Sequence, residues 1–323
     1  MYDLNHIKAP VASYVEDFHS QFAEILSAKS EWLQQALEFL NASTGKQVRP
    51  ILVALLAGAL RAEAPSGKSI EAAVLLELIH TATLIHDDVI DEAKTRRGQP
   101  TLGAIFDNRV AVLMGDFVLS SALIGAIALG DLRIMYIVSA IGRELTEGEI
   151  RQFETADSLR LSEANYYDII RQKTAELFAA CAEVAAITSD ADEDSRQRAR
   201  QIGMSLGMAF QIRDDIFDYF RSDVGKPTGN DLREGKITLP LLHVLLQQED
   251  ASPYLALLQE RPISSESIDR LTHLAHDGGG IRYAEERLQS YIDEAKALIA
   301  PLPASPYKDS LLALADYIAL RKY

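Results

Sequence analysis

Apolar residues recur along most of this 323-residue chain at the three- and four-residue spacing of amphipathic helices, whereas alternating β-branched runs are few. The pattern therefore predicts an all-α protein. Helices are expected over residues 11–39 (two helices), 51–60, 70–91, 109–129, 132–155, 162–188 and 195–220, and the helices after residue 237 are assigned to packing alone. In the N-terminal pair, an inward apolar stripe is expected at Trp32, Leu33, Leu37 and Leu40.

Two of the expected helices end in the same arrangement of carboxylates. The two clusters are Asp87, Asp88 and Asp91, and Asp214, Asp215 and Asp218, and each follows an apolar run. Residues three and four apart share a helix face, so the carboxylates of each cluster lie close together and repel one another. One acidic helix end is usually a solvated surface, but two copies of one spacing favour a function. They predict sites for Mg²⁺, which prefers a few carboxylates together with water and phosphate oxygens.

Charge and composition narrow the choice of ligand. The formal net charge of −15 argues against nucleic acid as a partner. Magnesium held by two facing clusters would surround a diphosphate, and in so acidic a protein local cations and metal must hold that ligand. With Cys181 as the one cysteine, no disulfide within the chain is possible. Residues 1–10 show no signal pattern, and no apolar run approaches the length of a membrane span. A cytoplasmic, soluble protein with at most peripheral membrane contact is expected.

The two clusters, with Arg96-Arg97-Gly98 after the first, resemble the first and second aspartate-rich motifs of the trans-isoprenyl diphosphate synthases. The resemblance extends over about residues 45–240. It implies one domain over residues 1–323, built as an isoprenoid-synthase bundle of long antiparallel helices around a central cavity that both clusters face. It also implies a homodimer and about three Mg²⁺ ions bridging the clusters and a diphosphate. The implied reaction is head-to-tail prenyl transfer between isopentenyl diphosphate and an allylic diphosphate.

The resemblance assigns roles to residues around the clusters. Isopentenyl diphosphate would be bound by Lys46, Arg49, His80 and Arg97, and the allylic diphosphate by Arg96, Lys173, Thr174, Gln211, Lys226 and Lys236. The catalytic set would be the six aspartates with Arg96 and Lys173, while Glu149 and Gln152 would lie near the reacting carbons and Asp116 would orient the site. The residue types suit these roles, because helix N-termini and guanidinium groups bind phosphate oxygens well. His86 is left as a packing or supporting residue.

The helix before Asp87 is expected to form a wall for the growing product. One helical turn rises about 5.4 Å, close to the length of one isoprene unit, so each turn upstream corresponds to roughly one unit. The nearest turn carries the small residues Ala82 and Thr83, and Ile79 follows. The facing wall is expected at Leu119, Ser120, Leu123, Ile124 and Ile127. Without a bulky side chain near the cluster, a product of about C35–C50, as in a quinone side chain, is predicted.

Other functions fit part of the pattern. The same motifs suit a short-chain synthase that makes a farnesyl or geranylgeranyl product of about C15–C20. A non-catalytic subunit of a heteromeric synthase would be expected to lack motif residues, and none is missing. A terpene cyclase uses one diphosphate and has no need of a second set of cations, and a head-to-head synthase usually differs around the clusters. A metal-binding scaffold explains the carboxylates but not the cations.

Overall fold

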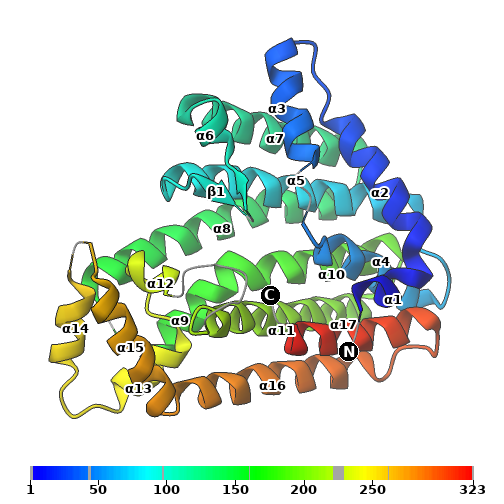
Figure 1. Ribbon diagram of the computed structural model, residues 1–323. Helices are drawn as coiled ribbons and strands as arrows, with labels where there is room; N and C mark the ends of the chain where they lie inside the picture. Colours follow the sequence, from blue (N-terminus) through cyan, green and yellow to red (C-terminus); the bar gives the residue numbers. More distant parts are fainter. Residues whose placement is uncertain are drawn as a thin grey trace. The chain divides into compact units, whose positions relative to one another are not determined.

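The computed structural model describes residues 3–42, 45–96, 98–159, 161–220, 229–260 and 262–321 (Figure 1). Backbone contacts divide the chain into two compact units. Unit 1 comprises Met1–Arg143, Leu177–Gly203 and Leu298–Leu314, and unit 2 comprises Glu144–Glu176, Met204–Ala297 and Ala315–Tyr323. Among the described residues almost all regular structure is helical, so the predicted all-α class is confirmed.

Unit 1 holds the N-terminal helices and the first acidic cluster. Its elements are α1 (Leu4–Lys8), η1 (Ala9–Val11), α2 (Ala12–Ile25), α3 (Glu31–Ala42), α4 (Val48–Arg61), α5 (Gly67–Ile90), β1 (Thr95–Arg96), β2 (Gln99–Pro100), α6 (Leu102–Ile105) and α7 (Asn108–Leu129). It also includes parts of α8 (Leu132–Ser158), α10 (Glu176–Thr188), α11 (Glu193–Phe217), α16 (Gly280–Ile299) and α17 (Pro306–Leu320).

Helices α4, α5 and α7 form the core of unit 1, and α5 and α7 lie side by side (Figure 1). Helix α4 is apolar on every side, and its residues from Ile51 to Ala59 are buried, as a helix without a polar face requires. Helix α5 begins where the Ser66 side chain accepts a hydrogen bond from the Ser69 backbone N–H, a standard N-cap. The first acidic cluster therefore lies at the C-terminal end of a long helix, α5, whose side chains are largely buried.

The predicted N-terminal stripe is correct only in part. Two helices, α2 and α3, occupy the predicted region, and Leu37 of α3 is fully buried. Trp32, however, is 66% exposed, so the expectation that it faces inward is wrong. Its ring contacts Phe106 at a centroid distance of 6.4 Å instead of entering the core.

Two helices are long and apolar enough to cross a membrane by length and composition alone. Neither is an uninterrupted apolar run, because α5 contains Glu77 and α7 contains Asp116. In α5 the apolar window has a mean hydropathy of 1.3, and 61% of it is buried inside the protein. In α7 the corresponding window has a mean hydropathy of 2.1, and 33% of it is buried. A core helix passes the same test, and the packing of α5 is that of a core helix.

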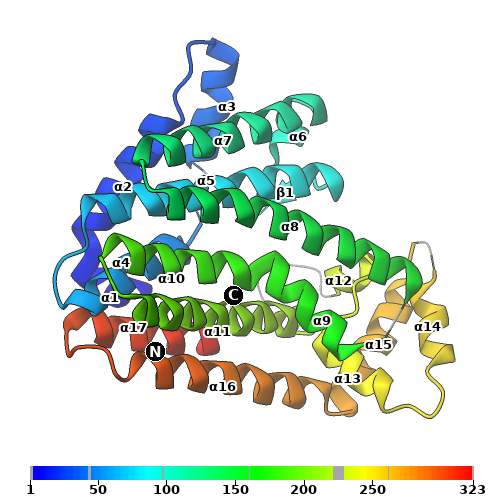
Figure 2. The same ribbon diagram turned by 180° about the vertical axis from the view of Figure 1, so that it is seen from behind.

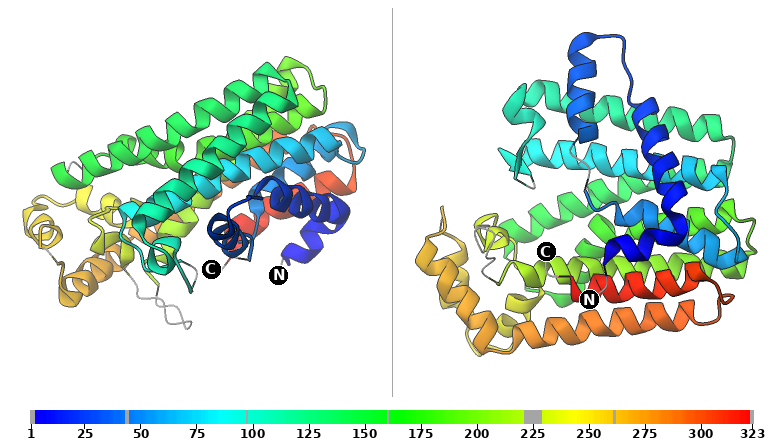
Figure 3. Two further views of the ribbon diagram at one scale, coloured as in Figure 1. Left: turned by 90° about the horizontal axis from the view of Figure 1, so that it is seen from above. Right: turned by 45° about the vertical axis from the view of Figure 1, so that its right-hand side comes forward.

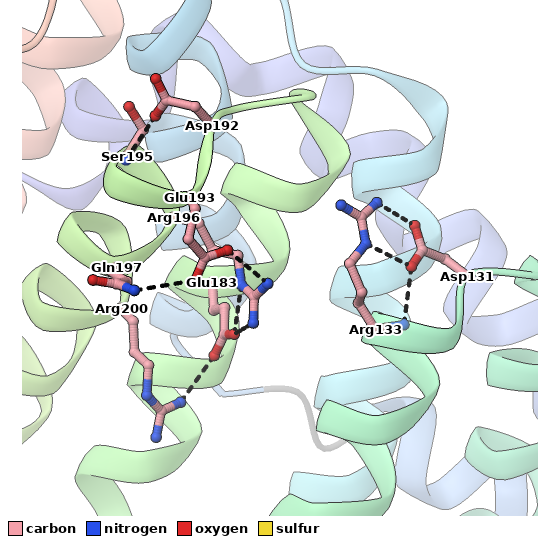
Figure 4. A network of polar contacts seen from close by, with 9 residues as sticks. All are labelled: Asp131, Arg133, Glu183, Asp192, Glu193, Ser195, Arg196, Gln197 and Arg200. Atoms are coloured by element: carbon pink, nitrogen blue, oxygen red, sulfur yellow. Dashed lines mark hydrogen bonds and ion pairs between the residues drawn. The ribbon is translucent and has the colours of Figure 1, made fainter.

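A polar network ties the helices of unit 1 together away from the acidic cluster (Figure 4). Glu183 of α10 accepts hydrogen bonds from Arg196 at 2.9 Å and from Arg200 at 3.0 Å, both on α11. At the start of α8, Asp131 pairs with Arg133 at 2.8 Å and with Lys68 of α5 at 2.9 Å. The hydrogen bonds from Arg133 lower the pKa of Asp131, so this carboxylate stays ionised.

Unit 2 holds the second acidic cluster. Its other elements are α9 (Glu163–Ile170), η2 (Arg171–Ala175), α12 (Asn230–Arg233), α13 (Leu239–Leu246), α14 (Ser252–Leu258) and α15 (Ser265–Asp277), and the remaining parts of α8, α11, α16 and α17 complete it. Helix α9 packs on α13 (Figure 2), and α13, α14 and α15 form the yellow-to-orange group in Figure 3.

The helix predicted over residues 162–188 contains an irregular turn. It consists of α9, the π-helical turn η2 and α10. A π-helical turn is less stable than α-helix and is frequent at functional sites. The turn contains Lys173 and Thr174, the two residues that the family resemblance assigns to binding of the allylic diphosphate.

Candidate active site

The first acidic cluster lies at the C-terminal end of α5. Asp87 and Asp88 belong to the last turn, and Asp91 is the C-cap residue. The β1–β2 hairpin carries Arg96 back to the cluster, where its Nε lies 2.8 Å from Oδ1 of Asp88. Burial raises the pKa of Asp88, and the Arg96 guanidinium offsets part of this rise. Arg96 is therefore paired with this cluster, and its predicted role in binding the allylic diphosphate stays a prediction. Arg97 lies outside the described residues.

His86, immediately before the cluster, packs against α7. Its Nε2 lies 3.4 Å from Oδ1 of Asp116 and from the carbonyl oxygen of Val112. A Cβ at Gly115 would come within 2.2 Å of this nitrogen, so only glycine leaves room for the imidazole. Asp116 and Gly115 thus contact the residue next to the cluster, and the orienting role of Asp116 stays a prediction.

Two of the residues proposed for isopentenyl diphosphate, Arg49 and His80, lie together near the start of α4. Arg49 lies in the first turn of α4, and its Nη1 is 3.0 Å from Nε2 of His80 on α5. The same guanidinium lies over the Phe178 ring at 4.8 Å. Lys46 precedes the helix in an exposed position. Arg49 and His80, 31 residues apart in sequence, are therefore brought together as this role requires.

The π-helical turn η2 packs closely on α8. Lys173 Nζ donates to Oε1 of Gln152 at 2.9 Å and forms an ion pair with Glu149. A Cβ at Gly148 would lie 2.8 Å from Cβ of Gln172 and 2.9 Å from Cγ of Lys173. Glycine at 148 therefore allows the close approach that places the Glu149 and Gln152 side chains on the lysine.

The second acidic cluster spans the end of α11, and its first carboxylate is held by the C-terminal region. Arg321 Nη2 lies 2.6 Å from Oδ1 of Asp214, and the guanidinium stacks on the Phe210 ring at 3.7 Å. The Arg321 side chain is only 7% exposed. The assignment of every residue after 237 to packing alone is therefore wrong. Nothing in the generic helical pattern around Arg321 signalled this contact.

The second carboxylate, Asp215, is buried and accepts two hydrogen bonds. Tyr166 donates to Oδ2 at 2.6 Å, and Gln211 Nε2 donates to Oδ1 at 2.8 Å. Gln211 in turn accepts from the Thr174 hydroxyl at 2.6 Å. Burial raises the pKa of Asp215 to about 6, against these hydrogen bonds, which lower it. Gln211 and Thr174 were predicted at the site, and Tyr166 was not.

The third carboxylate, Asp218, holds the loop that follows. Its Oδ1 accepts from the Asn230 N–H and its Oδ2 from the Asp231 N–H, both at 3.0 Å. Lys236 is tied to the same loop, because its N–H donates to the Asp231 carbonyl at 2.7 Å and its side chain pairs with Glu234. The predicted flap residue Lys226 lies outside the described residues.

The donor set of the second cluster fits a divalent cation. Asp231, which sequence reasoning missed, lies beside the cluster, and burial followed by repulsion from Asp215 and Asp218 raises its pKa well above the ordinary value. Burial also raises the pKa of Asp215 and Asp218. Several buried carboxylates that repel one another are stabilised when a cation binds. Within the described ranges no group of three or more acidic, histidine or cysteine side chains is placed so that it could hold a metal ion by itself. Mg²⁺ in proteins usually takes only one or two carboxylates and completes its coordination with water and phosphate oxygens.

A cavity of about 130 Å³ adjoins the second cluster within unit 2. Polar side chains from four segments line it, and the polar lining residues are Gln152, Thr155, Ser162, Tyr166, Asp215, Asp231, Lys236 and Thr238. The remaining lining includes Ile169, Ile170 and Leu242. This volume is enough for several water molecules, and the lining offers them hydrogen-bond partners.

The chain-length wall predicted on α5 stays a prediction, whereas the side chains predicted to face it from α7 do not point at α5. Ile79 and Ala82 are buried in α5, Thr83 is half-buried, and α7 packs along this helix as predicted. The side chains named for the facing wall nevertheless point the wrong way, because Leu123, Ile124 and Ile127 are exposed. The buried face of α7 carries Met114, Gly115, Val118, Ala122 and Ala126 instead. A Cβ at Gly125 would lie 2.5 Å from Leu75 of α5, which shows how closely the two helices approach.

This fold and this set of carboxylates and cations define an isoprenoid-synthase-type transferase. A model of the polyprenyl synthetase family matches residues 30–275. The chain is 37% identical over 284 residues to an octaprenyl diphosphate synthase of Haemophilus influenzae, a match that covers 86% of this chain and 85% of the relative.

Two solved structures show the same fold. A polyprenyl synthase from Caulobacter crescentus, complexed with calcium and isoprenyl diphosphate, aligns with a TM-score of 0.92 at 30% identity, over 99% of this chain and 98% of that chain. A geranylgeranyl pyrophosphate synthase from Bacteroides thetaiotaomicron aligns with a TM-score of 0.85 at 38% identity, over 98% and 99%.

The chain belongs to the polyprenyl synthetase family. The predicted family, the isoprenoid-synthase fold class and the enzyme class, a trans-polyprenyl diphosphate synthase, are confirmed. Enzymes of this family join isopentenyl and allylic diphosphates with the help of a divalent metal ion.

Proposed function

We propose that this protein condenses isopentenyl diphosphate with an allylic diphosphate, head to tail, to an all-trans polyprenyl diphosphate of about C35–C50. The observation that carries the proposal is the presence of two sets of cationic and hydrogen-bonding groups whose chemistry suits a diphosphate. Arg49 is paired with His80 in unit 1, and Lys173 stands in a π-helical turn whose Thr174 is linked through Gln211 to Asp215 in unit 2. A cyclase, which uses one diphosphate, needs only one such set.

The six aspartates of the two clusters are the proposed Mg²⁺ ligands, and both clusters serve one reaction. Bound magnesium, about three ions in our proposal, would neutralise the charge that develops on the leaving diphosphate. Arg96, Lys173, Thr174, Gln211, Lys226 and Lys236 are proposed to bind the same diphosphate. Fixed cations around the leaving oxygens stabilise the transition state more than the bound substrate, because the charge develops there.

The second substrate is the nucleophile. Isopentenyl diphosphate, held by Lys46, Arg49, His80 and Arg97, attacks the allylic carbon through its double bond. Holding both substrates in a productive orientation raises their effective concentration enough to account for a large part of the rate enhancement. Loss of a proton to the released diphosphate completes one five-carbon extension.

We further propose that the two units form one synthase domain and that the protein is a cytoplasmic homodimer. The exposed apolar face of α7 and the start of α8 supports the homodimer. Its large side chains are Val112, Leu113, Leu123, Ile124, Ile127, Leu132 and Tyr136. Burial of such a face against a second copy removes apolar surface from water, which is the main driving force of obligate dimerisation.

Product chromatography tests the reaction. Incubation with farnesyl diphosphate, excess isopentenyl diphosphate and Mg²⁺ is expected to give a long-chain product, and omission of isopentenyl diphosphate is expected to give none. A cyclic hydrocarbon formed from the allylic substrate alone would establish a cyclase. No product from either mixture would favour the non-catalytic subunit.

Substitution of Ala82 tests the assignment of product length. The Ala82 side chain is buried on the helix that leads to Asp87. Ala82→Phe is expected to shorten the product to about C15–C20, and Ala82→Leu is expected to give an intermediate length. An unchanged product distribution in both variants would exclude this wall. A wild-type product of about C20 would instead support the short-chain alternative, to which the Bacteroides relative belongs by name.

A further inference from the structure

Tyr166 is a hydroxyl-bearing residue that contacts the second acidic cluster and has no role in the proposed reaction. It lies in α9, its side chain is buried, and its hydroxyl donates to Oδ2 of Asp215 at 2.6 Å. Hydrogen bonds to a charged acceptor at this length are among the stronger ones in proteins.

The Tyr166–Asp215 contact is one end of a chain of three hydrogen bonds. The Thr174 hydroxyl donates to Gln211 Oε1, Gln211 Nε2 donates to Asp215 Oδ1, and Tyr166 donates to Asp215 Oδ2. An ionised carboxylate only accepts, so both of its partners must donate. The Gln211 amide has one orientation that satisfies both of its neighbours. The chain therefore has a defined direction and fixes every side chain in it.

This chain joins three elements, α9, the π-helical turn η2 and α11. Thr174 is adjacent to Lys173, whose amine is held by Gln152 and Glu149 of α8. The hydrogen bonds of Gln211 thus link the orientation of the Asp215 carboxylate to the position of the π-helical turn that contains Lys173. Removal of one hydroxyl at either end frees the neighbouring group to rotate.

We infer that Tyr166 is a positioning residue that holds the Asp215 carboxylate in the orientation needed for metal and diphosphate binding. The inference rests on the proposed function, because that function gives Asp215 its metal. Tyr166 itself contacts no reacting atom and acts through Asp215.

The surroundings of Tyr166 separate this role from simple packing. The cavity of about 130 Å³ reaches both the Tyr166 ring and Asp215, so water has space next to the carboxylate. Without the Tyr166 hydroxyl, a water molecule can donate to Oδ2 but does not fix its direction. We therefore expect a weakened site and not an abolished one.

The neighbouring residue supplies a matched control. The Tyr167 ring contacts the Tyr166 ring edge-on at 5.4 Å, but its hydroxyl accepts a hydrogen bond from Arg287 of α16, at 3.2 Å, and not from the acidic cluster. Tyr166→Phe and Tyr167→Phe remove the same atom from adjacent positions of one helix. Only the first of them breaks the chain to Asp215.

The experiment compares Mn²⁺ binding in the two variants, measured by electron paramagnetic resonance with inorganic pyrophosphate present, together with steady-state kinetics. Tyr166→Phe is expected to weaken Mn²⁺ binding about tenfold and to lower kcat about tenfold, with KM for isopentenyl diphosphate unchanged. Tyr167→Phe is expected to match wild type in all three. Thermal unfolding of both variants measures any general loss of stability.

Wild-type Mn²⁺ binding in Tyr166→Phe, with or without a lower melting temperature, would overturn the inference and leave Tyr166 a packing residue. If Tyr166→Phe does not fold, Thr174→Val tests the other end of the chain, and wild-type Mn²⁺ binding in that variant would overturn the inference equally. Failure of the proposed function gives a different result, because wild-type protein would then form no prenyl product while the Mn²⁺ comparison could still be made.

Discussion

The two acidic clusters share one spacing but differ in how the protein holds them. In the first, Asp88 pairs with Arg96, only eight residues away, at the partly exposed end of α5. In the second, Asp214 pairs with a nearly buried Arg321, 107 residues away, and Asp215 is held by Tyr166, 49 residues away. The carboxylates of one sequence pattern can therefore be paired either by neighbouring residues or by residues from distant parts of the chain. The second cluster accordingly depends more on the tertiary fold.

Removal of the paired arginine tests this difference most strongly. Arg321→Met leaves Asp214 without its partner and removes a stacked, nearly buried guanidinium, so the free energy of unfolding is expected to fall by about 2–3 kcal/mol. Arg96→Met, at a side chain that is 36% exposed, is the matched control, with an expected loss below about 1 kcal/mol. Urea unfolding of metal-free protein measures both. Equal losses would show that the two clusters do not differ in this way.

Neutralisation of Asp215 is expected to raise the free energy of unfolding, by less than Arg321→Met lowers it. Burial raises its folded-state pKa to about 6, above the ordinary value of 3.8. Because the pKa is raised, the protonated Asp215 makes its full contribution to stability below about pH 4. This contribution is lost as the pH rises through about 6 and the group ionises. Asp215→Asn is therefore expected to stabilise the metal-free protein by about 2 kcal/mol at pH 7.5 and by little at pH 4.

Asp131 provides the contrast for this pH dependence. Hydrogen bonds from Arg133 lower its pKa, so its contribution to stability is present above about pH 4 and is lost only as the pH falls further. Asp131→Asn is expected to destabilise the protein at pH 7.5. The free energies of unfolding of Asp215→Asn and Asp131→Asn, measured in a chelating buffer between about pH 4 and pH 7.5, show whether the two substitutions have opposite effects. A loss of stability in Asp215→Asn at pH 7.5 would contradict the assigned effect of burial.

The smallest expected effect concerns the packing of α8 on the π-helical turn. Gly148→Ala places a Cβ against Gln172 and Lys173, and such overpacking costs about 1–2 kcal/mol. Gly142→Ala, in the same helix with nothing within 4 Å of the added atom, is expected to stabilise the helix by about 0.5 kcal/mol. Melting temperatures of the two variants compare these effects. A gain of stability in both would show that α8 has room to move away from η2.

The sequence predicts the helices and both acidic clusters because these depend on local periodicity and spacing. It places α4 at residues 51–60, although the helix begins at Val48, because Gln47 adopts a left-handed conformation that the pattern does not reveal. Sequence reasoning also chooses the wrong face of α7. That helix is apolar almost all round, so hydrophobicity cannot distinguish the face with Gly115 and Ala122 from the face with Ile124.

The partners of the second cluster could not be predicted in the same way. Tyr166 and Arg321 show no distinguishing pattern in the sequence, and only the packing of α9, and of the residue that follows α17, brings them to α11. The chemistry of Lys173 and Thr174 attracts attention, but no rule of periodicity predicts that they lie in a π-helical turn. Contacts between distant segments therefore account for most of what the sequence leaves out.

The wide turn at Arg171–Ala175 has a consequence for how this chain can change. A π-helical turn holds one more residue than the α-helical turn it replaces, so deletion of a single residue there would restore a regular helix. That deletion would remove one position of the turn itself, so the contacts that Lys173 makes with Gln152 and Thr174 makes with Gln211 could not both be kept. The protein with this more regular helix would thus be a less active enzyme. Selection for function is expected to preserve the extra residue.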